Sequence, residues 1–242
     1  MDEETYKQYY ETVATQKNIW NTEKNSPMYF QEMIRYEAVL RQLPKSATHI
    51  VDLGCGDGYL SYQMAKKGHV VTSVDLSANR LKKFEAVAQK YTIQQVKADI
   101  KNTGLPSGFF DAVVCSEVIE HIKGYQDVLR EAFRILKPGG TFIVTVPYNE
   151  QLKIIICPHC HKPFYRDGHV NSFNKQNLAQ SLREAGFHVD TQTTFRSKLS
   201  VHIQYHFKLK YGILLKGIDW FFSRLLPNFT FYLLVKSRKS VD

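Results

Sequence analysis

The hydrophobic pattern begins with a helical period and then changes to short apolar runs separated by amphipathic segments. Residues 29–43, YFQEMIRYEAVLRQL, place apolar side chains three or four positions apart and stop at Pro44, which predicts an amphipathic helix. Short β-branched runs predict strands at 48–53, 69–75, 93–100, 109–117, 141–149, 188–196 and 229–239. Helical patterns lie between most of them, at 58–68, 78–91, 124–137, 174–187 and 211–226.

This alternation predicts the fold class. Strands that alternate with helices form βαβ units, whose right-handed crossovers give a parallel sheet covered on both faces. We therefore expect an α/β protein, with an N-terminal helical cap over residues 1–45 and one domain over 46–242. The domain would carry an insert at 148–173, where the alternation is interrupted, and a basic amphipathic lid at 199–226.

Charge is concentrated near the end of the chain. Residues 191–242 contain nine Lys or Arg against two Asp, so they hold +7 of the net charge of +9. Such a region favours an anionic partner such as phospholipid, a phosphorylated substrate or nucleic acid, although a solvated basic face explains it equally well. The apolar run 211–226 is interrupted by Lys216, Asp219 and Arg224, which is typical of a lid or a membrane-surface segment rather than a membrane span.

The N-terminal residues show neither a secretory signal nor a transit peptide. Cys55 and Cys115 are isolated and read as reduced thiols. These features predict a cytoplasmic location, with peripheral contact at the inner membrane surface as an extension of the lid hypothesis.

A glycine-rich loop follows the first predicted strand. In VDLGCGDG the strand carries Asp52 and runs into Gly54, Gly56 and Gly58, which allow a ligand to approach the backbone. The next two strands end near Asp75 and Asp99, at the sheet edge where ligands bind. A nicotinamide-binding domain is the alternative, but the third glycine comes one residue too early for G-x-G-x-x-G.

The motifs VDLGCGDG, VDLS, KADI, FDAVVCSEVIEHI and LREAFRILKPGGTFIVTVP resemble, in this order, the class I S-adenosylmethionine-dependent methyltransferases. The resemblance is strongest over residues 29–147 and is to small-molecule members, including quinone-pathway O-methyltransferases. It implies a Rossmann-like parallel sheet with an antiparallel last strand and helices on both faces. It also implies methyl transfer to an oxygen or carbon of a small or lipid-linked acceptor.

The resemblance assigns residues to the cofactor. Asp52 and the loop of Gly54, Cys55, Gly56 and Gly58 would hold the methionine part, and Ser116 would line it. Asp75 would bind the ribose, while Leu76, Asp99 and Ile100 would contact the adenine. More weakly, Arg35 would reach the cofactor carboxylate beneath an aromatic cover of Tyr9, Tyr10, Trp20 and Tyr29.

The segment EVIEHI, residues 117–122, supplies the predicted catalytic groups. A sulfonium methyl group is already electrophilic, so the protein need only align an acceptor and remove its proton. His121 is the candidate general base and Glu117 or Glu120 would orient it, because imidazole titrates near neutrality. The alternative is that His121 only hydrogen-bonds a loop.

The stretch CPHCHKPFYRDGH, residues 157–169, is the second candidate site. Cys157 and Cys160 have the spacing of half a zinc knuckle, with His169 as a third ligand and His161 or Asp167 as the fourth. We expect structural zinc on Cys157, Cys160, His169 and His161. A redox pair and a catalytic metal with an open position are the alternatives.

Two other functions stay open. An RNA methyltransferase would use the basic tail, although no RNA-binding appendage is recognisable, so nucleic acid is the less favoured partner. A non-catalytic domain that binds the cofactor or a partner protein is the third hypothesis.

Overall fold

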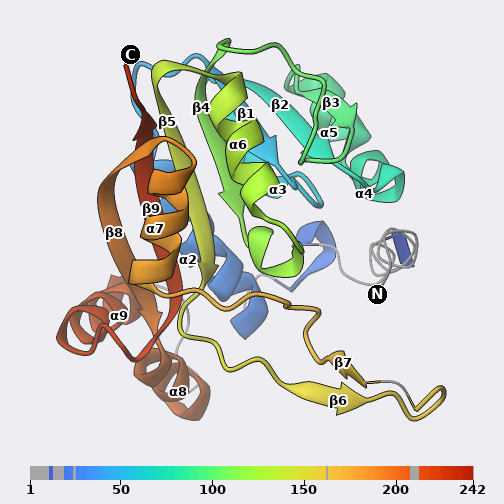
Figure 1. Cartoon of the computed structure of the whole chain (residues 1–242). Helices are drawn as coiled ribbons and strands as arrows, with labels where there is room; N and C mark the ends of the chain where they lie inside the picture. The colour runs from blue at the N-terminus through green and yellow to red at the C-terminus, as the bar shows by residue number, and fades with distance from the viewer. Residues whose placement is uncertain (1–10, 13–18, 24–25, 162, 208–212, 242) are drawn as a thin grey trace.

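A seven-stranded sheet forms the centre of this computed structural model (Figure 1). The structure describes residues 11–12, 19–23, 26–161, 163–207 and 213–241. The strand order is β3-β2-β1-β4-β5-β9-β8. The strands are β1 (His49–Leu53), β2 (Val70–Asp75), β3 (Gln94–Lys97), β4 (Phe110–Ser116), β5 (Leu136–Pro147), β8 (Phe187–Ser197) and β9 (Thr230–Lys239).

Strand directions confirm the predicted fold class. The pairs among β3, β2, β1, β4 and β5 are parallel, whereas β9 runs antiparallel to both of its neighbours, β5 and β8. The parallel strands therefore end at one edge, and the glycine loop after β1 opens there.

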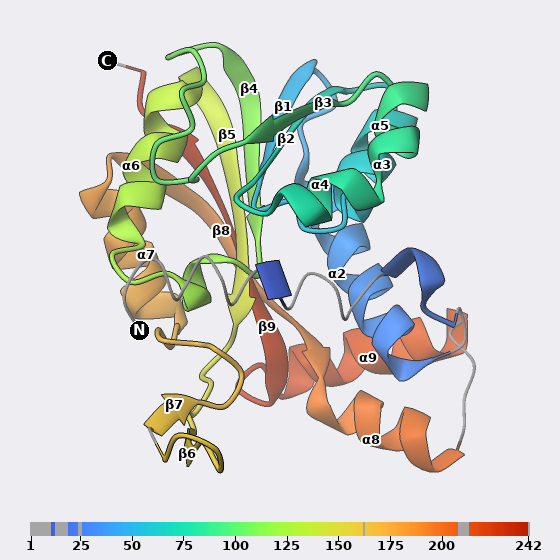
Figure 2. The same cartoon turned by 90° about the vertical axis from the view of Figure 1, so that its right-hand side faces the viewer.

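Helices cover both faces of the sheet, as Figure 2 shows from its edge. On one side lie α6 (Gln126–Ile135) and α7 (Lys175–Glu184), which contribute Leu129 and Leu182 to the core. On the other lie α2 (Pro27–Gln42), α3 (Tyr59–Lys66), α4 (Ala78–Lys83) and α5 (Glu85–Lys90). Val39 of α2 and Leu43, the C-cap residue of this helix, belong to the same core as Ile50 of β1, so α2 packs directly on the sheet.

The helix predicted over 78–91 is broken into α4 and α5 at Phe84. Phe84 leaves helical geometry (φ −119°, ψ 17°) and its ring is fully buried directly against Gly58. Periodicity could not predict this break, because a buried aromatic at the junction keeps the apolar spacing of a continuous helix.

Two additions lie at the edge where the parallel strands end (Figure 1). The predicted insert contains a hairpin of β6 (Ile154–Ile156) and β7 (Pro163–Tyr165) that extends away from the sheet. Between β8 and β9 the chain forms α8 (Lys198–Phe207) and α9 (Ile213–Leu225), within the predicted lid. None of the described helices has both the length and the apolar character needed to span a bilayer.

Candidate active site

A cavity of about 210 Å³ lies at the carboxyl ends of β1 and β4. Its walls come from the glycine loop, from α2, and from the start of the β4–α6 connection. The lining residues are Ile19, Thr22, Met28, Glu32, Arg35, Tyr36, Asp52, Gly54, Cys55, Gly56, Asp57, Leu60, Arg80, Ser116 and Glu117.

The glycine loop has the conformation that its residues permit. Gly54, Gly56 and Gly58 have φ of +73°, +54° and +72°, the left-handed region that glycine adopts without steric cost. A Cβ on Gly54 would lie 2.6 Å from Val118, and one on Gly58 would overlap the Phe84 ring. The loop therefore needs glycine both for its backbone and for its close packing.

Carboxylates from β1 and β2 hold this loop in place. Asp75 accepts hydrogen bonds from the backbone N–H of Gly56 and of Ser77, both at 2.9 Å. Asp52 is buried and accepts from the Ser61 hydroxyl at 2.6 Å. Burial raises the pKa of Asp52 to about 6, although the Ser61 hydrogen bond opposes the rise.

The structure brings half of the predicted cofactor residues into the cavity wall. Asp52, Gly54, Cys55, Gly56 and Ser116 line it, together with Arg35 from α2. Burial raises the pKa of the Cys55 thiol well above its usual value, which makes Cys55 a packing residue rather than a nucleophile.

The other half lies outside the wall. Gly58 closes the loop by donating its N–H to Cys55 O, and Ile100 is buried in the core. Asp99 accepts from the Lys101 N–H at 2.9 Å. For these residues, as for Asp75 and Leu76, the contacts with ribose and adenine stay predictions.

The predicted aromatic cover needs correction for its described members. Trp20 donates its indole N–H to Asp57 O at 2.7 Å and packs on Tyr59 and Tyr62, with ring centroids 5.0 and 5.3 Å away. It thus anchors η1 (Ile19–Asn21) on α3 while Ile19 lines the cavity. Tyr29 does not line the cavity either, and Tyr9 and Tyr10 lie outside the described residues.

Several residues in the cavity wall, or close to the end of β2, have no motif that marks them in the sequence. Glu11 accepts hydrogen bonds from the Ser77 hydroxyl (2.7 Å) and the Ala78 N–H (3.0 Å), next to the end of β2. Arg80 and Glu32 line the cavity from two helices. Only Asp57, inside the glycine loop, stands in a motif that could have indicated it.

The predicted catalytic residues take different positions relative to the cavity. Glu117 lines it, with φ of +56° and with its N–H bonded to Thr145 O at 3.0 Å. Burial raises the pKa of Glu117 to about 7, partly offset by Arg35. The backbone strain at Glu117 is the cost of turning its side chain from the end of β4 toward α2.

His121 ends η2 (Ile119–His121) and packs edge-on against His169, with ring centroids 4.5 Å apart. Its Nδ1 lies 3.3 Å from Gly168 O, and its Nε2 lies 3.8 Å from Glu120 Oε1, too far for a hydrogen bond. Burial, reinforced by His169, lowers the pKa of His121 to about 4, so the imidazole is neutral at neutral pH.

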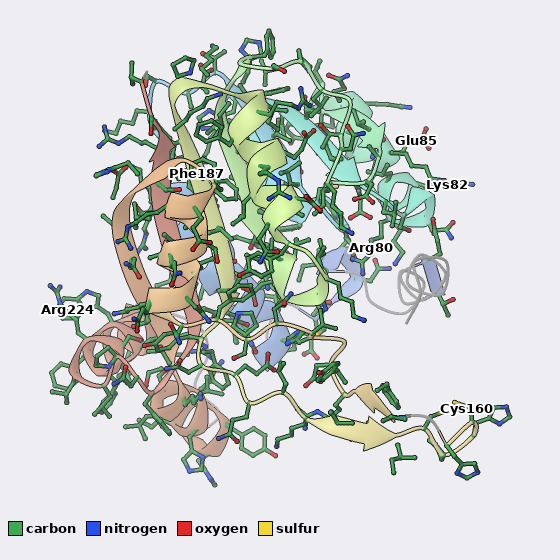
Figure 3. All side chains as sticks on the ribbon, in the orientation of Figure 1. Arg80, Lys82, Glu85, Cys160, Phe187 and Arg224 are labelled. Atoms are coloured by element: carbon green, nitrogen blue, oxygen red, sulfur yellow. The ribbon has the colours of Figure 1, made fainter. Side chains whose placement is uncertain are left out.

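The predicted zinc ligands do not come together. Cys157 and Cys160 lie at the tip of the β6–β7 hairpin, and Figure 3 places Cys160 at its far end. His169 instead meets His121 and Glu120, and its Nδ1 contacts Glu150. The stretch reads as one motif, but the hairpin separates its two ends in space. His161 is exposed, and the alternative ligand Asp167 pairs with Arg166 at 2.8 Å.

Comparison with known proteins places this geometry in a family. The family model of the methyltransferase domain matches residues 29–192. Ubiquinone biosynthesis O-methyltransferase of Coxiella burnetii is 31% identical over 134 residues, 54% of this chain and 57% of that protein. The Xanthomonas oryzae protein of the same name is 34% identical over 125 residues, 49% of this chain and 51% of that protein. The chain thus spans about half the length of the curated relatives it matches.

Solved structures share the fold. An S-adenosylmethionine-dependent methyltransferase from Mesorhizobium loti superposes with a TM-score of 0.63 at 19% identity, covering 87% of this chain and 100% of that one. A Burkholderia thailandensis 1,6-didemethyltoxoflavin-N1-methyltransferase with bound S-adenosylhomocysteine has a TM-score of 0.61 at 16% identity, covering 98% and 87%. At these identities the likeness concerns the fold alone. With two thirds of its length matched by the family model, the chain belongs to the methyltransferase-domain family.

Proposed function

We propose that the protein transfers a methyl group from S-adenosylmethionine to an oxygen of a small or lipid-linked acceptor. The observation that carries the proposal is the cavity between the glycine loop, Arg35 and Glu117. The family membership and the names of the curated relatives support the reaction and the oxygen acceptor.

The charges around the cavity fit this cofactor. Asp52 offers a carboxylate to an ammonium group, and Arg35 offers a guanidinium to a carboxylate, so both charged groups on the α-carbon of a methionine moiety find a partner. The glycine loop lets the cofactor lie against the backbone. When bound, the sulfonium supplies an electrophilic methyl group, and the protein has to orient the acceptor and exclude water.

The cofactor site can be tested by calorimetry with S-adenosylhomocysteine. We expect the wild-type protein to bind it and Asp52→Ala to weaken binding at least tenfold, with Asp190→Ala, a control on β8 outside the cavity wall, unchanged. Radiolabel transfer from S-adenosylmethionine to a lipid or small-molecule extract then identifies the acceptor. A protein that binds the nucleoside yet labels no fraction would support the non-catalytic alternative.

A surface on α9, the helix that contacts α2 through Lys216 and Glu37, supports a lipid-linked acceptor and peripheral contact of a cytoplasmic protein with an anionic membrane. On α9 and just after it, Leu214, Phe221, Leu225 and Phe229 are each about half or more exposed. Arg224, labelled in Figure 3, lies over the Trp220 ring at 5.3 Å. Lys198 lies 5.7 Å from the centre of the Phe229 ring, so cations accompany the apolar side chains. Apolar side chains with adjacent cations are typical of interfacial binding.

Vesicle sedimentation tests this surface. The double variant Phe221→Ser/Leu225→Ser should lose most binding to phosphatidylglycerol vesicles, because the two side chains lie one turn apart on α9. Phe109→Ser is the matched control, since Phe109 is 44% exposed at the opposite end of the sheet. Equal binding by both variants would remove the membrane proposal and leave the cofactor site untouched.

A further inference from the structure

Three side chains from two separate segments converge behind the candidate cavity. Glu120 and His121 belong to η2, and His169 lies in the return from the β6–β7 hairpin. One ligand atom from each, a carboxylate oxygen or an imidazole nitrogen, lies within 4.8 Å of the others. Among the described residues this is the group of three His, Cys, Asp or Glu that has such spacing.

Glu120 gives an independent indication of a ligand. Its side chain is 1% exposed, and neither carboxylate oxygen has a hydrogen-bond partner. One oxygen of the neighbouring Glu117, Oε1, is likewise buried without a hydrogen-bond partner. Burying a carboxylate without a hydrogen-bond partner destabilises the folded state by on the order of several kcal/mol, as for any unpaired buried charge. Native proteins therefore pair such groups or use them to bind a metal.

The two imidazoles are oriented as metal-binding imidazoles are. His169 has its Nδ1 against the Glu150 carboxylate, and His121 has its Nδ1 3.3 Å from Gly168 O. An acceptor on Nδ1 favours the tautomer whose Nε2 carries a lone pair, and metal-ligating histidines are held in this way by a carboxylate or a backbone carbonyl. In both histidines, Nε2 is therefore the nitrogen available to bind a cation.

Backbone contacts hold the segments together. Glu120 O accepts from the N–H groups of Val170 and Asn171, at 2.8 and 3.0 Å. The Asn171 amide donates to Ile119 O and Ile122 O. The arrangement is thus built by the fold and does not depend on the exposed hairpin tip.

We propose that Glu120, His121 and His169 bind a divalent transition-metal cation, with Glu117 between this cation and the cofactor cavity. Two nitrogen donors and a carboxylate suit Mn²⁺, Co²⁺, Zn²⁺ or Fe²⁺ better than Ca²⁺ or Mg²⁺, which prefer all-oxygen sites. Three protein ligands leave coordination positions for water or an acceptor.

The role of the cation rests on the proposed function. An acceptor hydroxyl on the metal loses its proton to solvent water more readily, because the cation stabilises the oxyanion. The oxygen lone pair then forms the bond to the methyl carbon, the carbon–sulfur bond breaks, and its electron pair returns to sulfur. His121 would then be a ligand rather than the general base. The acceptor class is a hydroxyl compound able to chelate, such as one with two neighbouring oxygens.

Calorimetry and visible absorption with Co²⁺ test the site, using chelator-treated full-length protein. The Cys157→Ser/Cys160→Ser background removes the hairpin thiols as competing ligands. In it we expect one Co²⁺ per chain and a d–d absorption band with nitrogen and oxygen ligation. Glu120→Gln and His169→Ala should each weaken Co²⁺ binding by a factor of about 100 or more. Changing a residue that only hydrogen-bonds to a metal ligand weakens binding by about 10–100-fold. His188→Ala, at an exposed histidine on β8, should not change it.

Circular dichroism melting of the metal-free variants shows whether each one folds, and Glu120→Gln is nearly isosteric. Absence of Co²⁺ binding at millimolar concentration in the Cys157→Ser/Cys160→Ser background overturns the inference. It is also overturned if the Glu120 and His169 variants bind Co²⁺ as tightly as this background does. S-adenosylhomocysteine binding is measured separately. If the protein binds S-adenosylhomocysteine but not Co²⁺, only the metal site is refuted. If it binds Co²⁺ but not S-adenosylhomocysteine, the proposed function is refuted.

Discussion

The carboxylate of Asp75, at the end of β2, accepts a hydrogen bond from the backbone N–H of Gly56 at 2.9 Å. The glycine loop after β1 is thus held by a side chain of the neighbouring strand β2 as well as by the conformation of its own glycines. The second Asp75 oxygen accepts from Ser77 N–H, at the start of α4. One side chain therefore positions two loops that face the cavity edge.

Asp75→Ala should lower both stability and cofactor affinity. Losing two charge-assisted hydrogen bonds in a buried position costs about 2–4 kcal/mol in the free energy of unfolding. Asp75→Asn keeps one acceptor oxygen and should lose about half as much. Urea unfolding and S-adenosylhomocysteine calorimetry measure the two effects, and a stability loss below about 0.5 kcal/mol for Asp75→Ala would contradict this role.

Gly54→Ala should destabilise the protein through two separable terms. The left-handed φ of +73° costs a non-glycine residue about 1 kcal/mol, and the new Cβ meets Val118 at 2.6 Å, which adds about 1–3 kcal/mol of overpacking. Val118→Ala removes the second term only. In a double-mutant cycle measured by denaturant unfolding, the pair should therefore lose less than the sum of the single losses, and strict additivity would argue against the contact.

The pH dependence of the free energy of unfolding should reflect the titration of Asp52. Its pKa is about 6 in the folded protein against an ordinary aspartate value of 3.8, so the folded state binds the proton more tightly. The stabilisation is fully present below pH ~4 and is lost as the pH rises through 6. Relative to Asp52→Asn, the wild type should lose up to about 3 kcal/mol over this window, as a shift of one unit corresponds to about 1.4 kcal/mol. Thermal unfolding at pH 4 and pH 7 measures it, and a flat or rising difference would refute the assignment.

Cysteine labelling should separate the hairpin from the core. Backbone N–H groups of Cys160 and His159, followed by the Cys160 thiol, lower the pKa of Cys157, whereas burial raises the pKa of Cys55 and Cys115. With iodoacetamide near pH 7.5, Cys157 should react first and Cys55 and Cys115 last, because the thiolate is the nucleophile. Mass spectrometry of digested protein gives the order. Faster modification of Cys55 would show that the glycine loop opens in solution.

The sequence alone was enough for the α/β fold class, the parallel strands and the glycine loop. These features depend on local properties: the hydrophobic period specifies each strand, and glycine at 54, 56 and 58 permits a turn that other residues resist. The sequence alone could not predict the helix break at Phe84, because the break arises from packing against Gly58, which is distant in the chain.

The zinc prediction shows, at a site, the same limit on what the sequence alone can predict. Residues 157–169 are close in sequence, and spacing alone assigns His169 to Cys157 and Cys160. The hairpin carries the cysteines outward, while backbone hydrogen bonds from Val170 and Asn171 to Glu120 O hold His169 beside His121. Which side chains share a site was decided by tertiary structure, because partners in a cluster are chosen by distance in space and by burial, and neither is a local property of the chain.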